Sequence, residues 1–173
     1  MALPAAGEEI VILNTNHGDI KLRFFADKAP QHVASFKKLV SEGFYDGIHF
    51  HRVIPGFMIQ GGCPNTKPGG ERNGPAGTGG PGYRIPAEFN DVKHERGILS
   101  AARSADPNSA GSQFFIMVKY SPHLDGQYSV FGEVFEGIDI ADAIVNLPRD
   151  RQDRPLAANP AIINSAKLET YQG

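Results

Sequence analysis

Short β-type runs separated by turn residues fill most of this 173-residue chain, and they constrain its fold more than any other feature. In residues 19–24 charged and apolar side chains alternate strictly, which is the pattern of a strand with one buried face. A second apolar run, residues 9–15, precedes it across Asn16-His17-Gly18, so the two runs predict a hairpin. Similar runs predict further strands over residues 47–53, 57–61, 98–102, 113–118, 128–134 and 159–169.

Apolar residues recur at helical spacing in two places. Pro30 opens the first helix, because proline fits a first helical turn, and Gly43 provides a C-terminal stop. The second helix covers residues 138–146 and ends before Pro148. Many short strands with two helices favour a mainly β fold, a closed or nearly closed antiparallel barrel whose ends the helices plug. The pattern does not establish the order of the strands.

The length of the chain predicts one domain, residues 8–173, preceded by a flexible tail over residues 1–7. The net charge of -2 argues against a general binder of nucleic acid or membrane surfaces. The single cysteine, Cys63, excludes an internal disulfide, and no apolar run approaches the roughly 18 residues of a membrane span. The N-terminus lacks the basic and apolar regions of a signal peptide. We therefore expect a cytoplasmic protein.

More than half of residues 63–82 are glycine or proline, which predicts a long loop of defined turns. Within this loop, Gly77-Thr78-Gly79-Gly80-Pro81-Gly82 satisfies the G-x-G-x-x-G dinucleotide motif. That motif must join a strand to a helix, but Pro81 interrupts it and Tyr83-Arg84-Ile85-Pro86 follows where the helix should begin. We therefore reject a nucleotide site, and the chain contains no Walker-type phosphate loop.

Side chains that could carry metal or covalent chemistry lack suitable partners in the sequence. His49 and His51 would share one face of a strand, but no cysteine or carboxylate stands nearby at a matching spacing. Ser112 lacks the second glycine of a nucleophile elbow, and Cys63 has no evident base. We expect no metal, no cofactor and no covalent intermediate.

Residues 50–62 place one permanent cation, Arg52, in an otherwise apolar run that ends with the uncharged Gln60. A guanidinium is charged at any working pH and only donates hydrogen bonds, so it stays in such a run if it is paired, exposed at a rim or used on a ligand. A second apolar region with amide groups comprises residues 101–103, 111–115 and 123–126; on its strand, Gln113 and Phe115 share a face. Together the two regions predict an apolar surface with one cation and a few amides.

These residues resemble the signature of the cyclophilins, the peptidyl-prolyl cis-trans isomerases. The resemblance covers about residues 8–170. It implies a closed eight-stranded antiparallel β-barrel capped by two α-helices, and an enzyme that rotates X-Pro peptide bonds and assists protein folding. The segments that carry it follow the order of the family: Phe50-His51-Arg52-Val53-Ile54-Pro55-Gly56-Phe57-Met58-Ile59-Gln60-Gly61-Gly62, Gly77-Thr78-Gly79-Gly80, Gly97-Ile98-Leu99-Ser100, Gly111-Ser112-Gln113-Phe114-Phe115-Ile116, Leu124-Asp125-Gly126 and Val130-Phe131-Gly132.

The resemblance also implies roles for individual residues. Arg52 stands at the position of the catalytic arginine. The other matching positions bind the substrate: a pocket for the proline ring (Phe57, Met58, Phe115, Leu124), a side chain that binds the peptide backbone (Gln60), one that helps to hold the arginine (Gln113), backbone that pairs with the peptide (Ala102, Arg103) and the pocket edge (His123, Tyr128).

Three of these positions depart from the usual pattern of the family. His123 replaces a tryptophan, so we expect weakened binding of cyclosporin A. Tyr128 replaces a histidine at the pocket edge, and Arg103 replaces an asparagine, which predicts a preference for acidic residues beside the proline. The implied partners are proline-containing peptides and client proteins, bound by a monomer. An alternative stays open: a proline-peptide binding or scaffold module in which turnover is incidental.

Overall fold

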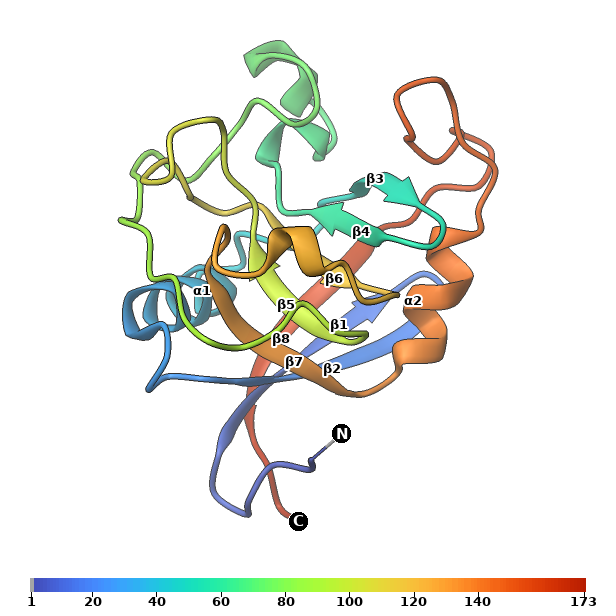
Figure 1. The fold of residues 1–173 in the computed structure, drawn as a ribbon. Helices are drawn as coiled ribbons and strands as arrows, with labels where there is room; N and C mark the ends of the chain where they lie inside the picture. Colours follow the sequence, from blue (N-terminus) through green and yellow to red (C-terminus); the bar gives the residue numbers. More distant parts are fainter. Residues whose placement is uncertain (1) are drawn as a thin grey trace.

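The computed structural model describes residues 2–173 and contains one antiparallel sheet of eight strands (Figure 1). The strands follow the spatial order β3-β4-β6-β5-β7-β2-β1-β8. They are β1 (Glu9–Thr15), β2 (Gly18–Phe24), β3 (Phe50–Ile54), β4 (Met58–Gly61), β5 (Ile98–Ala101), β6 (Phe114–Met117), β7 (Val130–Glu136) and β8 (Ile163–Thr170).

The predicted hairpin at the start of the chain is confirmed. Strands β1 and β2 pair with Leu13 opposite Ile20 and Val11 opposite Leu22, and all four side chains are fully buried. The alternation of residues 19–24 therefore does mark a strand with one face toward the core. The charged face of β2 stays near the solvent, where Lys21 forms an ion pair with Glu136 of β7.

The predicted closure of the barrel is wrong, because the sheet is a curled half-barrel with β3 and β8 at its two ends. These two edges approach each other at an isolated bridge between His49 and Ile162. Beyond that bridge the edge of β3 faces a loop, with the Val53 N–H donating to the carbonyl of Asp153. The loop contains Pro155 and Pro160, which have no N–H to donate, so this segment cannot extend β8 as a regular ladder strand.

Both predicted helices are confirmed, as α1 (Pro30–Ser41) and α2 (Ile138–Val145). Helix α1 buries Val33, Phe36, Leu39 and Val40, the residues at helical spacing, against the sheet. The two helices lie on opposite sides of the curled sheet in the view of Figure 1. None of the helices among residues 2–173 combines the length and the apolar composition that crossing a membrane requires.

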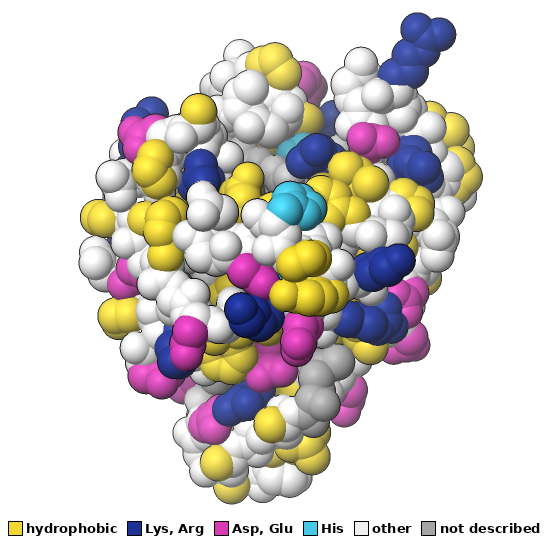
Figure 2. Space-filling view, in the orientation of Figure 1, with side chains coloured by type: hydrophobic (Ala, Val, Ile, Leu, Met, Phe, Trp, Pro, Cys, Tyr) yellow, Lys and Arg dark blue, Asp and Glu magenta, His cyan; other side chains and the backbone are white. Residues whose placement is uncertain are grey.

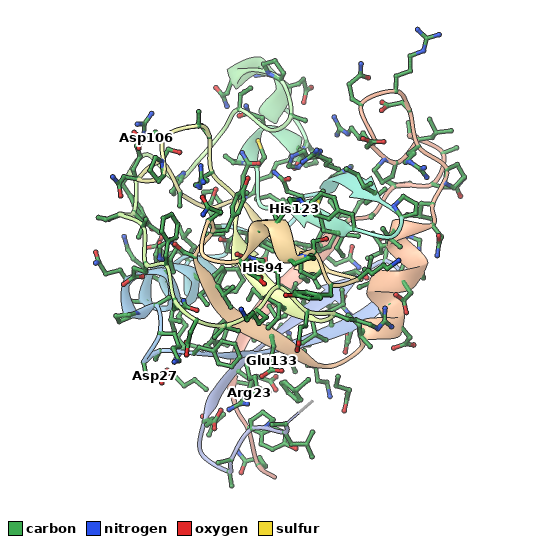
Figure 3. All side chains as sticks on the ribbon, viewed as in Figure 1. Arg23, Asp27, His94, Asp106, His123 and Glu133 are labelled. Atoms are coloured by element: carbon green, nitrogen blue, oxygen red, sulfur yellow. The ribbon has the colours of Figure 1, made fainter. Side chains whose placement is uncertain are left out.

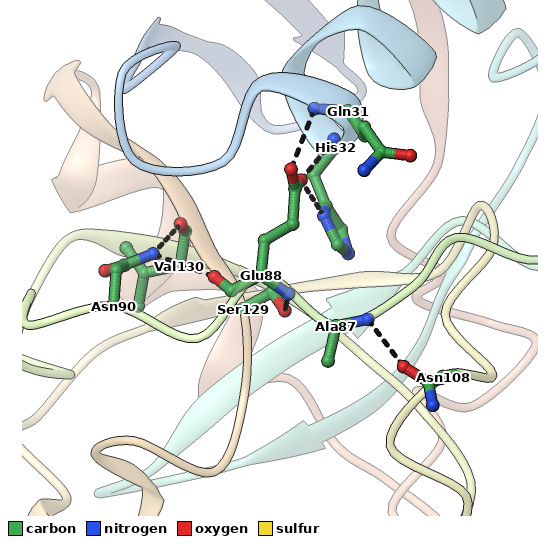
Figure 4. Close-up of polar contacts among 8 residues, drawn as sticks. All are labelled: Gln31, His32, Ala87, Glu88, Asn90, Asn108, Ser129 and Val130. Atoms are coloured by element: carbon green, nitrogen blue, oxygen red, sulfur yellow. Dashed lines mark hydrogen bonds and ion pairs between the residues drawn. The ribbon is translucent and has the colours of Figure 1, made fainter.

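Helix α1 has no side-chain cap of its own, and Glu88 from a distant segment supplies one (Figure 4). The Glu88 carboxylate accepts hydrogen bonds from the backbone N–H groups of Gln31 (3.2 Å) and His32 (2.9 Å), and it also contacts Nδ1 of His32. Burial favours a higher pKa for Glu88, but the hydrogen bonds from His32 and Gln31 outweigh burial and lower it. A negative charge is thus fixed at the positive end of the helix.

The irregular segment that carries Glu88 is tied to the sheet as well. The Glu88 N–H donates to the hydroxyl of Ser129, and the Asn90 side chain donates to the carbonyl of Val130 in β7 (Figure 4). These bonds fix a stretch without regular secondary structure between two parts of the site described below.

Buried apolar side chains form two clusters. The larger one fills the space between α1, α2 and the sheet. The smaller one, which we call the pocket cluster, consists of Met58, Ile98, Phe115, Met117, Leu124 and Val130, with Phe25, Ile54, Phe57, Val92, Ala102 and Tyr128 partly buried against it.

The two ends of the described chain lie side by side (Figure 1). The Gly7 N–H donates to the carbonyl of Tyr171, and the Tyr171 N–H donates to the carbonyl of Glu8. The division into a tail over residues 1–7 and a domain over residues 8–173 stays a prediction.

Candidate active site

The hairpin of β3 and β4 places Arg52 directly opposite Gln60. The Pro55-Gly56 turn joins the two strands, and Gly56 adopts the left-handed conformation (φ 74°) that glycine reaches without a steric penalty. The Arg52 side chain is exposed, and its Nη1 donates to Oε1 of Gln60 at 3.5 Å. Among residues 2–173 no carboxylate lies within ion-pair distance of Arg52, so its charge faces the solvent with a neutral amide as its one described polar partner.

Gln60 is itself held by Gln113, which stands just before β6. The Gln60 Nε2 donates to Oε1 of Gln113 at 3.1 Å. The chain can approach this closely because Gly62 has no side chain: a Cβ there would lie 2.3 Å from the carbonyl oxygen of Ser112. Gln113 was predicted to help hold the arginine, and the structure places it one step away, with Gln60 between them.

Gln60 and Gln113 form a row of hydrogen-bonded amides, which the rejected G-x-G-x-x-G segment completes. Gln113 Nε2 donates to the carbonyls of Gly77 and Gly79, both at 2.9 Å. The N–H groups of the same two glycines donate to the sulfur of Cys63 at 3.3 Å. A phosphate loop points its N–H groups at the ligand, whereas here they point at a buried thiol. The segment therefore orients Gln113 and does not form a nucleotide site.

The four side chains predicted to receive the proline ring gather in the pocket cluster, next to Gln60. Met58 lies on β4, Phe115 on β6 opposite Gln60, and Leu124 at the end of the 3₁₀ turn η3 (Pro122–Leu124). Tyr128 meets the ring of Phe115 edge-on, with 5.5 Å between the ring centroids. Phe57 is partly buried at the open side of the cluster.

His123 is exposed beside the pocket cluster. In Figure 2 a histidine lies among hydrophobic side chains near the middle of the face shown, and Figure 3 labels His123 at that place. Its ring is tilted against Phe57, with the centroids 6.1 Å apart. The other edge residue, Tyr128, carries the guanidinium of Arg103 over its ring at 4.6 Å.

Arg103 is held in place by carbonyl groups. Its Nε and Nη2 both donate to the carbonyl of Gln127 (3.0 and 2.8 Å), and its Nη1 donates to the carbonyl of Ser104 (2.9 Å). The neighbouring Ala102 uses its N–H on the carbonyl of Gln113. Pairing with a peptide would therefore fall to the carbonyl of Ala102 and to the backbone of Arg103.

A cavity of about 620 Å³ adjoins the pocket on the side of the two glutamines. Gln60 and Gln113 form part of its wall, and residues 77–84 and 102–104 form most of the rest. The two glutamines thus separate this cavity from the pocket cluster.

Of the groups considered for metal or covalent chemistry, Ser112 and Cys63 have hydrogen-bond partners, whereas His51 is buried with no described partner at Nδ1. The Ser112 hydroxyl is buried and donates to the carbonyl of Gly62. Burial, followed by the charges of Arg154 and Arg52, lowers the pKa of His51 to about 4, and its buried Nδ1 has no partner among the described residues. Within residues 2–173 no three His, Cys, Asp or Glu side chains are grouped so that they could hold a metal ion.

Sequence reasoning missed a buried histidine that lies under the pocket. His94 contacts Phe115, Ser100 and Asp125, and it belongs to the irregular segment that Glu88 anchors. Asp125 stands in the Leu124-Asp125-Gly126 motif and could have drawn attention, but no local pattern singles out His94.

Fold and site thus define a β protein with an apolar cluster beside a cation that no described carboxylate pairs. The family model of the cyclophilin-type peptidyl-prolyl cis-trans isomerase/CLD family matches residues 10–167. A peptidyl-prolyl cis-trans isomerase of Synechococcus elongatus is 54% identical over 122 residues, which cover 70% of this chain and 77% of that relative. Peptidyl-prolyl cis-trans isomerase B of Bacillus subtilis is 47% identical over 129 residues, covering 73% of this chain and 83% of the relative.

Solved structures give the same assignment. The crystal structure of a Cryptosporidium parvum cyclophilin-type isomerase, obtained in the presence of the dipeptide Ala-Pro, matches with a TM-score of 0.83 at 33% identity and covers 94% of this chain and 99% of that one. The chain belongs to the cyclophilin-type peptidyl-prolyl cis-trans isomerases. It is accordingly an enzyme that isomerises X-Pro peptide bonds.

Proposed function

We propose that Arg52 is the catalytic residue and that it stabilises the prolyl nitrogen of the twisted peptide bond. Rotation about a peptide bond must break resonance and faces a barrier of about 18–20 kcal/mol. Turnover at about 10³ per second needs a barrier near 13 kcal/mol, so the enzyme has to remove roughly 5–7 kcal/mol. At the twisted state the nitrogen regains its lone pair, and a guanidinium N–H can donate to it more strongly than to the planar amide.

The observation that carries this proposal is the combination of an exposed, uncompensated Arg52 with an adjoining apolar pocket. One charge-assisted hydrogen bond supplies about 1.5–3 kcal/mol. A dry pocket that holds the ring, with backbone bonds to its flanking residues, would supply the remainder. A guanidinium paired with a carboxylate would be less able to donate to a weak acceptor, so a neutral partner such as Gln60 suits this role.

The remaining site residues then take binding roles. Phe57, Met58, Phe115 and Leu124 receive the proline ring, and Gln60 serves both Arg52 and the peptide backbone. The backbone of Ala102 and Arg103 pairs with the peptide, while Gln113 keeps Gln60 in place. The Ala-Pro dipeptide used with the Cryptosporidium relative supports proline-containing peptides as substrates here, and we expect client proteins whose folding the enzyme assists.

The pocket edge sets two further expectations. An imidazole at His123 offers less apolar area than an indole, so binding of cyclosporin A should be weak. The guanidinium of Arg103 is held by carbonyls and not by carboxylates, so no neighbouring negative charge among the described residues offsets it, and we expect peptides with an acidic residue beside the proline to turn over faster. Exchange of Glu for Lys in that position of a substrate tests this, and equal turnover would exclude it. A monomeric state and a cytoplasmic location stay predictions.

Exchange NMR on a short X-Pro peptide tests the role of Arg52 without a coupled protease. We expect Arg52→Ala to lower kcat/KM by roughly tenfold or more, which is about 1.4 kcal/mol of barrier, while peptide affinity is largely retained. Arg52→Lys is the matched control, since it keeps the charge but loses the planar guanidinium group. Its kcat/KM should lie between the values of the wild type and of Arg52→Ala. Unchanged turnover in Arg52→Ala would exclude the proposed role, and slow wild-type turnover with intact binding would support a proline-peptide binding or scaffold module.

A further inference from the structure

A fully buried polar group lies directly beneath the apolar pocket and has no part in the mechanism above. The imidazole of His94 is 0% exposed and stacks on the ring of Phe115, with 5.9 Å between the centroids and 16° between the ring planes. Tyr128 meets both rings nearly at right angles. In Figure 3 His94 lies just below His123.

Hydrogen bonds on both ring nitrogens fix the orientation of this imidazole. Nδ1 of His94 is 3.1 Å from Oδ1 of Asp125, and Nε2 is 3.0 Å from the hydroxyl of Ser100. The Asp125 carboxylate also accepts the His94 backbone N–H and the hydroxyl of Tyr120, both at 2.7 Å. A carboxylate only accepts, so Nδ1 carries the proton and Nε2 accepts from Ser100.

Burial lowers the pKa of His94, although Asp125 acts in the opposite direction. The ring is therefore neutral at pH 7, which agrees with the tautomer that its two partners require. A neutral ring with both nitrogens bonded has one orientation, and it presents one flat face to Phe115.

Ser100, His94 and Asp125 have the residue types and bonding order of a nucleophilic triad, but they cannot act as one. The side chains of Ser100 and His94 are both 0% exposed, and Phe115 covers the imidazole. A substrate carbonyl has no route to the Ser100 hydroxyl, which nucleophilic attack would require. Their common neighbour is the floor of the pocket, and this points to a positioning role.

We infer that His94 is a positioning residue that holds the ring of Phe115 in the orientation required to receive proline. The inference rests on the proposed role of Phe115 in the pocket. Without a bonded ring behind it, Phe115 would keep its edge contact with Tyr128 but would be free to tilt. A stacked aromatic pair contributes enough to shift an equilibrium about two- to tenfold, so its loss should be seen in peptide affinity before it is seen in the rate of rotation.

Two variants of His94 test the inference on the whole chain. His94→Ala removes the ring, and we expect about a three- to tenfold weaker affinity for an Ala-Pro peptide with kcat changed less, together with additional orientations of Phe115 in NMR spectra of its labelled ring. His94→Phe keeps a ring of similar size without its hydrogen bonds, so it serves where His94→Ala does not fold. We expect it to shift the Phe115 signals and to weaken affinity by about threefold.

Two controls separate positioning from general destabilisation. Tyr120→Phe removes a hydroxyl from the same Asp125 but leaves His94 bonded, and it should change neither affinity nor the Phe115 signals. Val11→Ala lowers stability from the main core, away from the pocket cluster. If Val11→Ala reproduces the changes of His94→Ala in affinity and Phe115 signals, or if both His94 variants leave them as in the wild type, the inference is overturned.

A Phe115→Ala variant separates this inference from the function proposed above. Unchanged peptide affinity in Phe115→Ala would show that the pocket assignment itself is wrong. Weakened affinity in Phe115→Ala, with no effect of either His94 substitution, would show that only the role of His94 is wrong.

Discussion

Arg52 and Phe115 both belong to the proposed site, yet the contacts that hold them differ in kind. Arg52 is exposed and has one described polar contact, at 3.5 Å to a neutral amide. Phe115 is 5% exposed and lies between a stacked imidazole and an edge-on phenol. Because Arg52 contributes little to packing while Phe115 is part of a buried cluster, catalysis and stability should be separable in the first case and coupled in the second.

This difference follows from the role that we propose for each residue. A guanidinium that assists the twisted state must be able to turn an N–H toward the substrate, so a long contact with a neutral amide is an advantage. A pocket that grips a ring must keep its shape while the bond turns, which requires side chains that are fixed before the substrate arrives. The row of amides from Gln60 through Gln113 to Gly77 and Gly79 is intermediate: its groups are held by hydrogen bonds, more firmly than Arg52 but without the packing of Phe115.

The largest expected effect is on stability, and it distinguishes Phe115 from Arg52 directly. Phe115→Ala should lower the free energy of unfolding by about 3–5 kcal/mol, as truncation of a buried phenylalanine does, and should lower activity as well. Arg52→Ala should change stability by less than about 0.5 kcal/mol, because it is a surface substitution, while it lowers activity. Urea unfolding measures the stability of both variants, and exchange NMR measures their activity. Comparable destabilisation by the two substitutions would contradict the distinction between Arg52 and Phe115.

The second prediction concerns His51, which precedes Arg52 on β3 but is buried. Its pKa of about 4, lowered first by burial, means that the unfolded chain binds a proton near pH 6.5 that the folded chain refuses. The contribution of His51 to stability should therefore fall as the pH drops from 6.5 to 4, by about 3 kcal/mol in total at 1.36 kcal/mol per pKa unit. Urea unfolding at a series of pH values measures this slope.

His51→Gln is the matching variant, since its side chain stays neutral throughout. It should lose most of the slope between pH 6.5 and 5, where the carboxylates have not yet protonated. His49 and His94, whose pKa values burial also lowers, account for the slope that remains. A variant with the full wild-type slope would show that His51 is not the residue responsible.

The third prediction addresses the amide row. Gln113→Glu keeps an acceptor for Gln60 but loses both donors to Gly77 and Gly79, and it turns a carboxylate toward their carbonyls. We expect a loss of about 1–3 kcal/mol in stability, from two hydrogen bonds of 0.5–1.5 kcal/mol each, and a lower kcat/KM because the new charge attracts Arg52. Gln113→Leu is the control for charge. It should lose about as much stability as Gln113→Glu but should retain more activity than Gln113→Glu.

The strands, both helices and the apolar face of α1 were predictable because each is a local pattern of period 2 or 3.6. The failure of closure was not predictable. It depends on whether residues 150–160 can pair with β3, some hundred positions away, and no local pattern contains that information. The strand pattern favoured a closed or nearly closed barrel and the resemblance implied a closed one, and neither takes account of Pro155 and Pro160.

In the candidate site, too, some features could be predicted from local sequence and others could not. Arg52 and Gln60 could be linked from the sequence, because a short hairpin joins them. The pairing of Gln60 with Phe115 depends on the register of β4 against β6, which the spacing of residues does not set. His94 could not be found at all, since its place under the pocket depends on an irregular segment that the distant Glu88 and Asn90 anchor.

The smallest expected effect is the pH dependence of catalysis itself. A guanidinium stays charged at any working pH, and burial lowers the pKa of His94 from its ordinary value, so this imidazole is neutral at pH 7. We therefore expect kcat/KM to change by less than about twofold between pH 6 and 9, measured by exchange NMR at constant ionic strength. His123→Phe is the control, because it removes the imidazole that packs against Phe57 beside the pocket cluster. A bell-shaped profile that survives this substitution would mean that a titrating acid or base takes part in the rotation, and the assignment of catalysis to an unpaired guanidinium would be wrong.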